Sequence, residues 1–291
     1  MKSRRRKAAA RTSRKETVAK TRRRRAAART PRAISRTAGK RPRTKPKPRT
    51  QAARAPRRAV ILLSGGLDSS TCLLIARSEG FEAHALSFEY GQRHAVELER
   101  ARAVASRYGA ASHRVLRIDL PERRASALTD PDATVPRGGV PGESPIPPTY
   151  VPARNTLFLA HAAALGESIG AGVIFIGANV LDYSGYPDCR PEFLAAFERA
   201  LRLGTKAGVE GALRFEIRAP LLAMTKAQIV RRAASLGLDF ALTSSCYDPG
   251  RGGRPCGGCD SCRLRAKGFA EAGLADPAVR RTPRRGKTLS L

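Results

Sequence analysis

The sequence predicts an α/β fold: a doubly wound, mainly parallel sheet with a small C-terminal four-cysteine module and a disordered basic N-terminal tail. Three observations predict it. Short apolar runs alternate with helix-length segments from residue 59 onward, which is typical of a parallel sheet covered by helices on both faces. Four of the six cysteines cluster near the C-terminus, and the first 58 residues contain almost no large apolar side chains.

The positive charge of the chain is concentrated at its N-terminus. Residues 1–58 carry 25 Lys or Arg and one acid, Glu16, and so hold +24 of the formal net charge of +31. Such a segment cannot bury enough apolar surface to offset the entropy of ordering, so we expect residues 1–57 to be disordered. One interpretation is nonspecific binding to nucleic acid or another polyanion. The alternatives are a solubilising extension, an artefact of the gene start, or a transit peptide.

The rest of the chain divides into three predicted parts. Residues 58–240 form the α/β domain, 241–275 a zinc module with a final helix, and 276–291 a second basic tail. No apolar stretch reaches the ~18 residues that a membrane span requires, and no secretory signal is present. The clustered cysteines suit a reducing compartment, so we expect a cytoplasmic protein. The sequence leaves open whether the chain forms a homodimer.

The elements follow from local patterns in chain order. The first strand is the apolar run Ala59–Leu63, which a glycine pair ends, and the helix after it is expected to be capped by Asp68 or Ser69. Residues 119–150 are rich in proline and glycine and predict a long loop that could act as a lid. Further strands are expected at Glu82–Phe88, His113–Ile118, Gly172–Gly177 and Arg214–Ile217, and helices at His94–Tyr108, Ala153–Ile169, Glu192–Leu203 and Thr225–Leu236.

The loop after the first strand is the strongest candidate for binding phosphate. It reads Ser64-Gly65-Gly66-Leu67-Asp68-Ser69-Ser70-Thr71. A helix N-terminus carries free N–H groups and partial positive charge, and adjacent glycines let an anion approach the backbone. It is not a Walker loop, because the one Gly-Lys-Thr, at 286–288, has Arg281 where the first glycine should be. A plain strand–turn–helix link is the alternative.

The cysteine cluster predicts a metal site. Cys246, Cys256, Cys259 and Cys262 have the spacing Cys-x9-Cys-x2-Cys-x2-Cys. Four thiolates suit a closed, tetrahedral and therefore structural zinc site. An iron–sulfur cluster is the main alternative, and buried free thiols are another.

The Ser64–Thr71 loop resembles the signature of the PP-loop ATP pyrophosphatases, which split ATP between its α- and β-phosphates and share a Rossmann-like fold. With the cysteine cluster, the chain is similar to the 7-cyano-7-deazaguanine synthase family of that superfamily over roughly residues 59–274. It departs from that family at Ser244, where a tryptophan is usual, and in the enlarged spacer Asp248–Pro255. The other segments that carry the resemblance are Phe88–His94, Tyr150–Leu159, Asp182–Phe193, Pro220–Lys226 and Cys259–Phe269.

The resemblance implies a reaction in queuosine biosynthesis. ATP and ammonia convert 7-carboxy-7-deazaguanine into 7-cyano-7-deazaguanine by way of an amide. A carboxylate and an amide both have poor leaving groups, so each oxygen must be adenylated before it departs. The implied cofactors are a structural Zn²⁺ and Mg²⁺ with the ATP.

We expect the following roles on this basis. Asp68, Ser69 and Lys226 are the catalytic candidates, with Asp68 holding Mg²⁺ and Lys226 and Arg154 neutralising phosphate charge. Leu63 through Thr71 form the nucleotide-binding loop, in which Ser64, Gly65, Gly66, Leu67 and Ser70 lie near the pyrophosphate. Asp182 or Asp188 would accept hydrogen bonds from the deazaguanine edge. The expected ring-stacking residues are Tyr90, Tyr183, Tyr186 and Phe193, and those expected to hold the carboxylate are Gln92, Arg93 and Arg190.

Cys189 could be a covalent nucleophile, but a packing or binding role is preferred because adenylation already activates the substrate. Two other functions stay open. A PP-loop enzyme that modifies tRNA would explain the basic tail but not the segment 182–193. A zinc protein that binds nucleic acid without catalysis would leave the Ser64–Thr71 loop unexplained.

Overall fold

The central sheet has five parallel strands in the order β3-β2-β1-β4-β5. It belongs to a computed structural model that describes residues 56–137, 146–181 and 185–278. The parallel sheet confirms the predicted α/β class. The strands are β1 (Arg58–Leu62), β2 (Glu82–Glu89), β3 (Ser112–Arg117), β4 (Val173–Phe175) and β5 (Glu216–Arg218).

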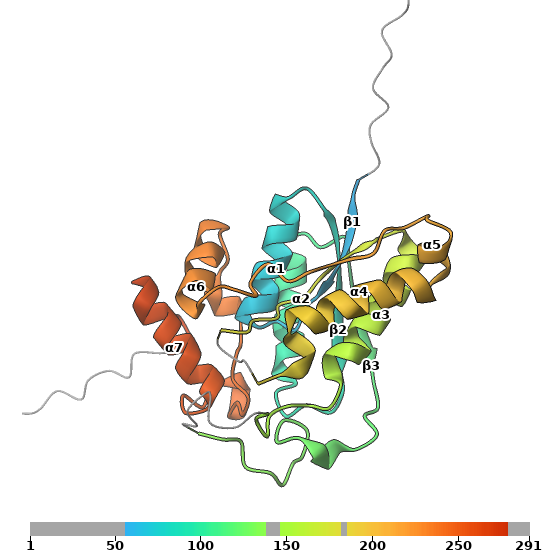
Figure 1. The fold of residues 1–291 in the computed structure, drawn as a ribbon. Helices are drawn as coiled ribbons and strands as arrows, with labels where there is room; N and C mark the ends of the chain where they lie inside the picture. The colour runs from blue at the N-terminus through green and yellow to red at the C-terminus, as the bar shows by residue number, and fades with distance from the viewer. Residues whose placement is uncertain (1–55, 138–145, 182–184, 279–291) are drawn as a thin grey trace, which may run out of the picture. The chain divides into compact units, whose positions relative to one another are not determined.

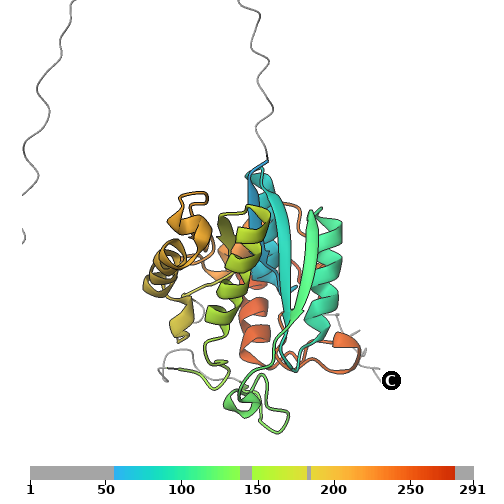
Figure 2. The ribbon, with the colours of Figure 1, turned by 90° about the vertical axis from the view of Figure 1, so that its right-hand side faces the viewer.

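Helices cover both faces of the sheet (Figure 1 and Figure 2). One face carries α1 (Leu67–Ser78), α2 (Val96–Arg107), α6 (Lys226–Ser235) and α7 (Asp260–Ala272). The other carries α3 (Arg154–Ile169) and α4 (Pro191–Gly204), and the short α5 (Lys206–Val209) follows α4. Single 3-10 turns lie at Arg123–Ala125, Pro187–Cys189, Phe240–Leu242 and Arg251–Gly253.

The central strand β1 shows why the sheet is buried on both sides. Ala59 and Ile61 pack into the core under α1 and α2, whereas Val60 and Leu62 pack into the core under α3. All four are at most 7% exposed. Because side chains alternate between the faces of a strand, only a continuous apolar run can fill two cores at once.

Two details of the fold differ from expectation. The N-cap of α1 is Gly66, not Asp68 or Ser69, and no side chain caps the helix. The helix therefore begins one residue before Asp68, which lies in its first turn. The four-residue α5 was not predicted, because a single turn leaves no periodic apolar pattern to detect.

The topology places the loop after β1 at a switch point. From β1 the chain connects to β2 on one side, and β4 adds on the other side. Ligands of open parallel sheets bind outside the carboxyl ends of the strands at such a point. The described part of the chain contains no helix that is long and apolar enough to cross a membrane. Residues 1–55 of the predicted tail and most of 276–291 lie outside the described residues, as do Asp182 and Tyr183.

Candidate active site

The two glycines after β1 have different surroundings. Gly65 has φ +84°, and a Cβ there would lie 2.4 Å from the carbonyl oxygen of Glu97 and 2.5 Å from the amide nitrogen of Ala101. The loop therefore touches the backbone of α2, which only glycine permits. Gly66 has an ordinary φ of −77°. A Cβ at Gly66 would lie 3.3 Å from the carbonyl oxygen of Ser244.

Two serines hold the shape of this loop. The hydroxyl of Ser69 accepts a hydrogen bond from the amide of Ser64 at 3.1 Å and lies 3.0 Å from the Ser64 hydroxyl. It also lies 3.3 Å from the carbonyl oxygen of Gly66. The N-terminus of α1 has no side-chain cap, so its first N–H groups are available to an anion.

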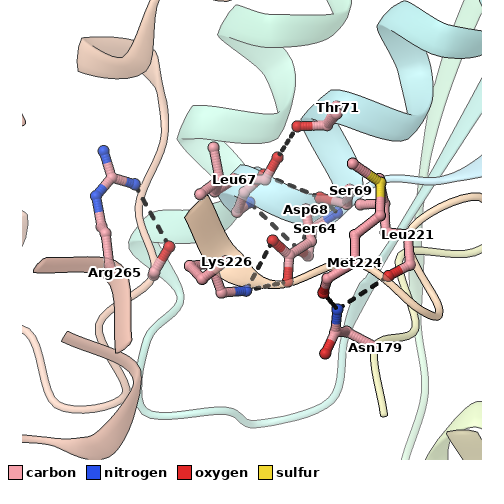
Figure 3. A network of polar contacts seen from close by, with 12 residues as sticks. Ser64, Leu67, Asp68, Ser69, Thr71, Asn179, Leu221, Met224, Lys226 and Arg265 are labelled. Atoms are coloured by element: carbon pink, nitrogen blue, oxygen red, sulfur yellow. Dashed lines mark hydrogen bonds and ion pairs between the residues drawn. The ribbon is translucent and has the colours of Figure 1, made fainter. Parts of the chain in front are cut away.

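Asp68 and Lys226 come together although 158 positions separate them. The Lys226 Nζ donates to Asp68 Oδ1 at 3.0 Å and to Oδ2 at 2.9 Å (Figure 3). Both side chains remain partly accessible, at 28% for Asp68 and 13% for Lys226. Lys226 is the first residue of α6, and a Cβ on Gly268 of α7 would lie 2.4 Å from its Cγ. Gly268 thus makes room for the stem of Lys226.

Ser70 and Thr71 point away from this region. The Thr71 hydroxyl donates to the carbonyl oxygen of Leu67 within the helix at 2.7 Å. Ser70 is fully buried and its hydroxyl has no hydrogen-bond partner. Neither side chain lines the cavity beside the loop, whereas Leu63, Ser64, Gly66, Leu67, Asp68 and Ser69 do. A direct role of Ser70 or Thr71 side chains in holding phosphate is therefore not what the geometry indicates.

That cavity has a volume of about 260 Å³ and a second, aromatic region. Phe88 and Phe158 stack with ring centroids 4.0 Å apart, and Tyr90 lies 5.5 Å from Phe158. Tyr186 also lines the cavity, and its hydroxyl lies 2.7 Å from that of Thr149. The cavity therefore joins a polar end at the α1 N-terminus to a wall of rings.

Arg154 lies on the aromatic side. Burial alone would lower the pKa of its guanidinium, but Tyr90, Tyr186 and Asp188 outweigh burial and raise that pKa above its usual value. The guanidinium of Arg154 therefore stays positively charged. Its Nε atom is buried and has no hydrogen-bond partner, although the residue lines the cavity. A buried donor without a partner is costly, and a bound anionic group would satisfy it.

Several expected substrate residues have structural partners instead. The Gln92 amide accepts from the Tyr90 amide and donates to the Phe88 carbonyl, although Gln92 does line the cavity. Arg93 donates to the Asp130 and Ala133 carbonyls and pairs with Asp248 at 3.4 Å. It thereby holds the 119–150 loop.

The expected substrate residues of the segment 188–193 also have other surroundings. Asp188 accepts a hydrogen bond from the Asn155 amide at 3.0 Å, in the first turn of α3. Arg190 is exposed, and Phe193 packs against Phe197. Arg93, Asp188, Arg190 and Phe193 do not line the cavity. Cys189 does, and burial, then Asp188, raises the pKa of its thiol to about 11, so it is not a thiolate at neutral pH.

The four cysteines of the C-terminal module converge as predicted. Their sulfur atoms all lie within 4.8 Å of one another. The Cys256 amide donates to the Cys246 sulfur at 3.1 Å, and the Cys259 amide to the Cys256 sulfur at 3.3 Å. Four sulfurs, two of them accepting backbone hydrogen bonds, fit a metal bound by thiolates.

Comparison with known proteins agrees with this arrangement. A family model described as queuosine biosynthesis protein QueC matches residues 58–273. The chain belongs to this family. A 7-cyano-7-deazaguanine synthase from Geobacter sulfurreducens is 59% identical over 76% of this chain and 92% of that protein. Enzymes of the same name from Geotalea daltonii and Dechloromonas aromatica are 60% and 58% identical, over 76% and 77% of this chain and 95% and 99% of those proteins.

The four-cysteine module is in contact with the loop after β1. The Ser244 amide donates to the Gly65 carbonyl at 3.0 Å. Together with Gly268 beside Lys226, this places residues of the C-terminal module against both the loop and Lys226. A metal that orders the module would therefore also order the loop and the lysine.

Sequence reasoning missed some residues that line the cavity, namely Glu97, Phe158, Asn179, Tyr247 and Arg265. Glu97 is the most unusual of them. Burial raises the pKa of its carboxyl group to about 8, against the opposing effect of Arg154. The one sequence signal that could have pointed to Glu97 as a cavity residue was its position five residues after Gln92, because Gln92 lies in a segment that already carried the family resemblance.

Proposed function

We propose that this chain makes 7-cyano-7-deazaguanine from 7-carboxy-7-deazaguanine, ammonia and ATP, and releases AMP and pyrophosphate twice. Family membership supports the reaction. The observation that carries the proposal is one cavity lined by Ser69, by the Asp68–Lys226 pair and by the ring of Tyr90. A triphosphate and a planar deazapurine can meet there.

The polar end is proposed to bind the departing pyrophosphate. Ser64, Gly66 and the first N–H groups of α1 would donate hydrogen bonds to its oxygens, and Lys226 would neutralise their charge. Asp68 would hold Mg²⁺, because its carboxylate is partly exposed to the cavity and hard oxygen ligands suit that ion. Bound Mg²⁺ supplies charge neutralisation at the phosphates.

The aromatic end is proposed to hold the deazaguanine. Tyr90 and Tyr186 offer rings and hydroxyls, and Arg154 is placed to grip the carboxylate that is adenylated. This moves Arg154 from a phosphate ligand to a substrate ligand. The unpartnered Nε of Arg154 supports the change, because a carboxylate would satisfy it.

The four cysteines are proposed to hold one structural Zn²⁺. A closed set of four thiolates leaves no open position for a substrate, so the metal would order the module and not act as a Lewis acid. Metal analysis of the purified chain should find about one zinc per chain, by the four-ligand rule. Iron in its place, with the absorption of a cluster, would support the iron–sulfur alternative.

The function is tested by incubating the full chain with the carboxylate substrate, ammonium and Mg-ATP, and following products by mass spectrometry. Amide, then nitrile, with AMP is the expected result. Formation of ADP and phosphate would contradict adenylation, and no turnover unless RNA is present would favour a tRNA-modifying enzyme. A chain that starts near Arg58 should react equally well.

A further inference from the structure

Glu97 is a carboxyl group in the cavity that the roles above do not use. It lies in the first turn of α2, and its backbone carbonyl is the atom that excludes a side chain at Gly65. Its side chain is 14% exposed. The nucleotide loop and Glu97 therefore line one cavity and are held together by a direct backbone contact.

The surroundings of Glu97 keep it from being a simple ion-pair partner. Its carboxylate lies 3.5 Å from the His94 Nε2 atom. Burial, then Arg154, lowers the pKa of His94 to about 4, so this imidazole is neutral. Arg154 of α3 and Tyr90 after β2 are the other ionisable groups that act on Glu97. Within the described ranges no lysine or arginine lies within 4 Å of its carboxylate.

Both halves of the proposed reaction need a base near the reacting carbon. Ammonium must lose a proton before its nitrogen can attack, and nitrile formation must remove the last N–H proton. The loop contributes hydroxyls and amides, Lys226 and Arg154 are cations, and Asp68 is paired. Among the described residues, Glu97 is the carboxyl group that lines this cavity without a lysine or arginine partner.

We propose, on the basis of the proposed function, that Glu97 is the catalytic base that takes protons from nitrogen in both steps. In the first step the Glu97 carboxylate takes a proton from ammonium. The ammonia then forms a C–N bond to the acyl adenylate, the C–O bond to AMP breaks with its electron pair on AMP, and the nitrogen releases a second proton to water.

Before the second step Glu97 returns its first proton to solvent. The amide oxygen then attacks the α-phosphorus of a second ATP, pyrophosphate leaves, one of the two N–H protons passes to water, and the imidate nitrogen keeps one proton. The Glu97 carboxylate removes that proton, and the N–H electrons form the third C–N bond. The C–O bond then breaks with its electrons on AMP, and the nitrile is released. No oxidant or reductant is required. A carboxyl group whose proton affinity is raised by burial is a stronger base than an exposed one, which suits this work.

Glu97→Gln is the test variant, and Glu99→Gln is the matched control. Glu99 lies on the same helix and is exposed, so its variant makes the same Glu-to-Gln replacement outside the cavity. Exchange of labelled pyrophosphate into ATP in the presence of the carboxylate substrate reports adenylation without ammonia. Glu97→Gln should retain this exchange but form amide about a hundredfold more slowly. Glu99→Gln should resemble the parent chain in both assays.

The amide provides the cleaner second assay, because its conversion to nitrile consumes no ammonia. In the parent chain this rate should rise with pH to a plateau above about pH 8, and Glu97→Gln should lose both the rate and that rise. Unchanged amide and nitrile formation in Glu97→Gln would overturn the proposal. Loss of pyrophosphate exchange along with them would show that Glu97 supports the loop and is not the base. A parent chain that makes no nitrile would instead reject the proposed function.

Discussion

The contact between Gly65 and α2 can be tested with a single methyl group. In Gly65→Ala the new Cβ would lie 2.4 Å and 2.5 Å from two backbone atoms of α2, where ordinary contacts are 3.4–4 Å. Neither atom can rotate away. The overlap should cost about 1–3 kcal/mol of stability, as overpacking does. The φ of +84° adds roughly 1–2 kcal/mol for an alanine. The free energy of unfolding should therefore fall by about 2–5 kcal/mol.

Gly66→Ala is the matched control for this experiment. Gly66 has φ −77°, which any residue adopts, and its new Cβ would meet one carbonyl oxygen at 3.3 Å. Its unfolding free energy should change by less than about 1 kcal/mol. Urea denaturation of both purified variants, followed by circular dichroism, measures the difference. Equal stabilities for Gly65→Ala and the parent chain would refute the close packing of the loop on α2.

Four further outcomes follow from the site. Lys226→Gln should lower the rate of nitrile formation by roughly a hundredfold, because it removes a cation at the phosphates. An unchanged steady-state rate of nitrile formation would contradict a role of Lys226 in neutralising phosphate charge. Cys189→Ser should keep the rate within a fewfold, since its thiol, with a pKa of about 11, is no nucleophile at neutral pH; inactivity with an intact fold would reinstate covalent catalysis. Asp276→Asn should destabilise the chain by about 3–5 kcal/mol in urea, because Arg265 and Asp276 form a pair only 6% exposed on each side. Between its usual pKa of 4.5 and about 8, Glu97 binds more protons in the folded chain than in the unfolded chain, so its contribution to stability is complete below pH 4.5 and is lost as pH rises through 8. The free energy of unfolding of Glu97→Gln, relative to that of the parent chain, should therefore grow over that pH range. A difference that stays constant with pH would mean that the carboxyl group is not buried as described.

The elements that sequence predicts well are those with a local cause. The apolar run of β1 has to be a buried strand, because it fills two cores. The spacing of the four cysteines has few interpretations other than a metal site, and their sulfurs do converge. Ser64, Asp68 and Ser69 lie in the cavity because eight consecutive residues specify a loop and a helix start.

The residues that sequence places poorly depend on distant contacts. Arg93 was expected to grip a substrate, but backbone carbonyls of the 119–150 loop occupy its guanidinium. Asp188 was expected at the deazaguanine edge, yet it binds the first turn of α3. Neither partner lies near these residues in sequence. Glu97 was missed for the same reason, since its burial depends on how α2 packs against the loop.

The central claim is that the oxygen atoms of the substrate carboxylate leave on AMP. The direct measurement uses 7-carboxy-7-deazaguanine labelled with ¹⁸O at both carboxylate oxygens, with ammonium and Mg-ATP, and mass spectrometry of the nucleotide products. The account predicts that each AMP carries one labelled oxygen and that amide and nitrile appear in order. Unlabelled AMP, or label in water or inorganic phosphate, would contradict it.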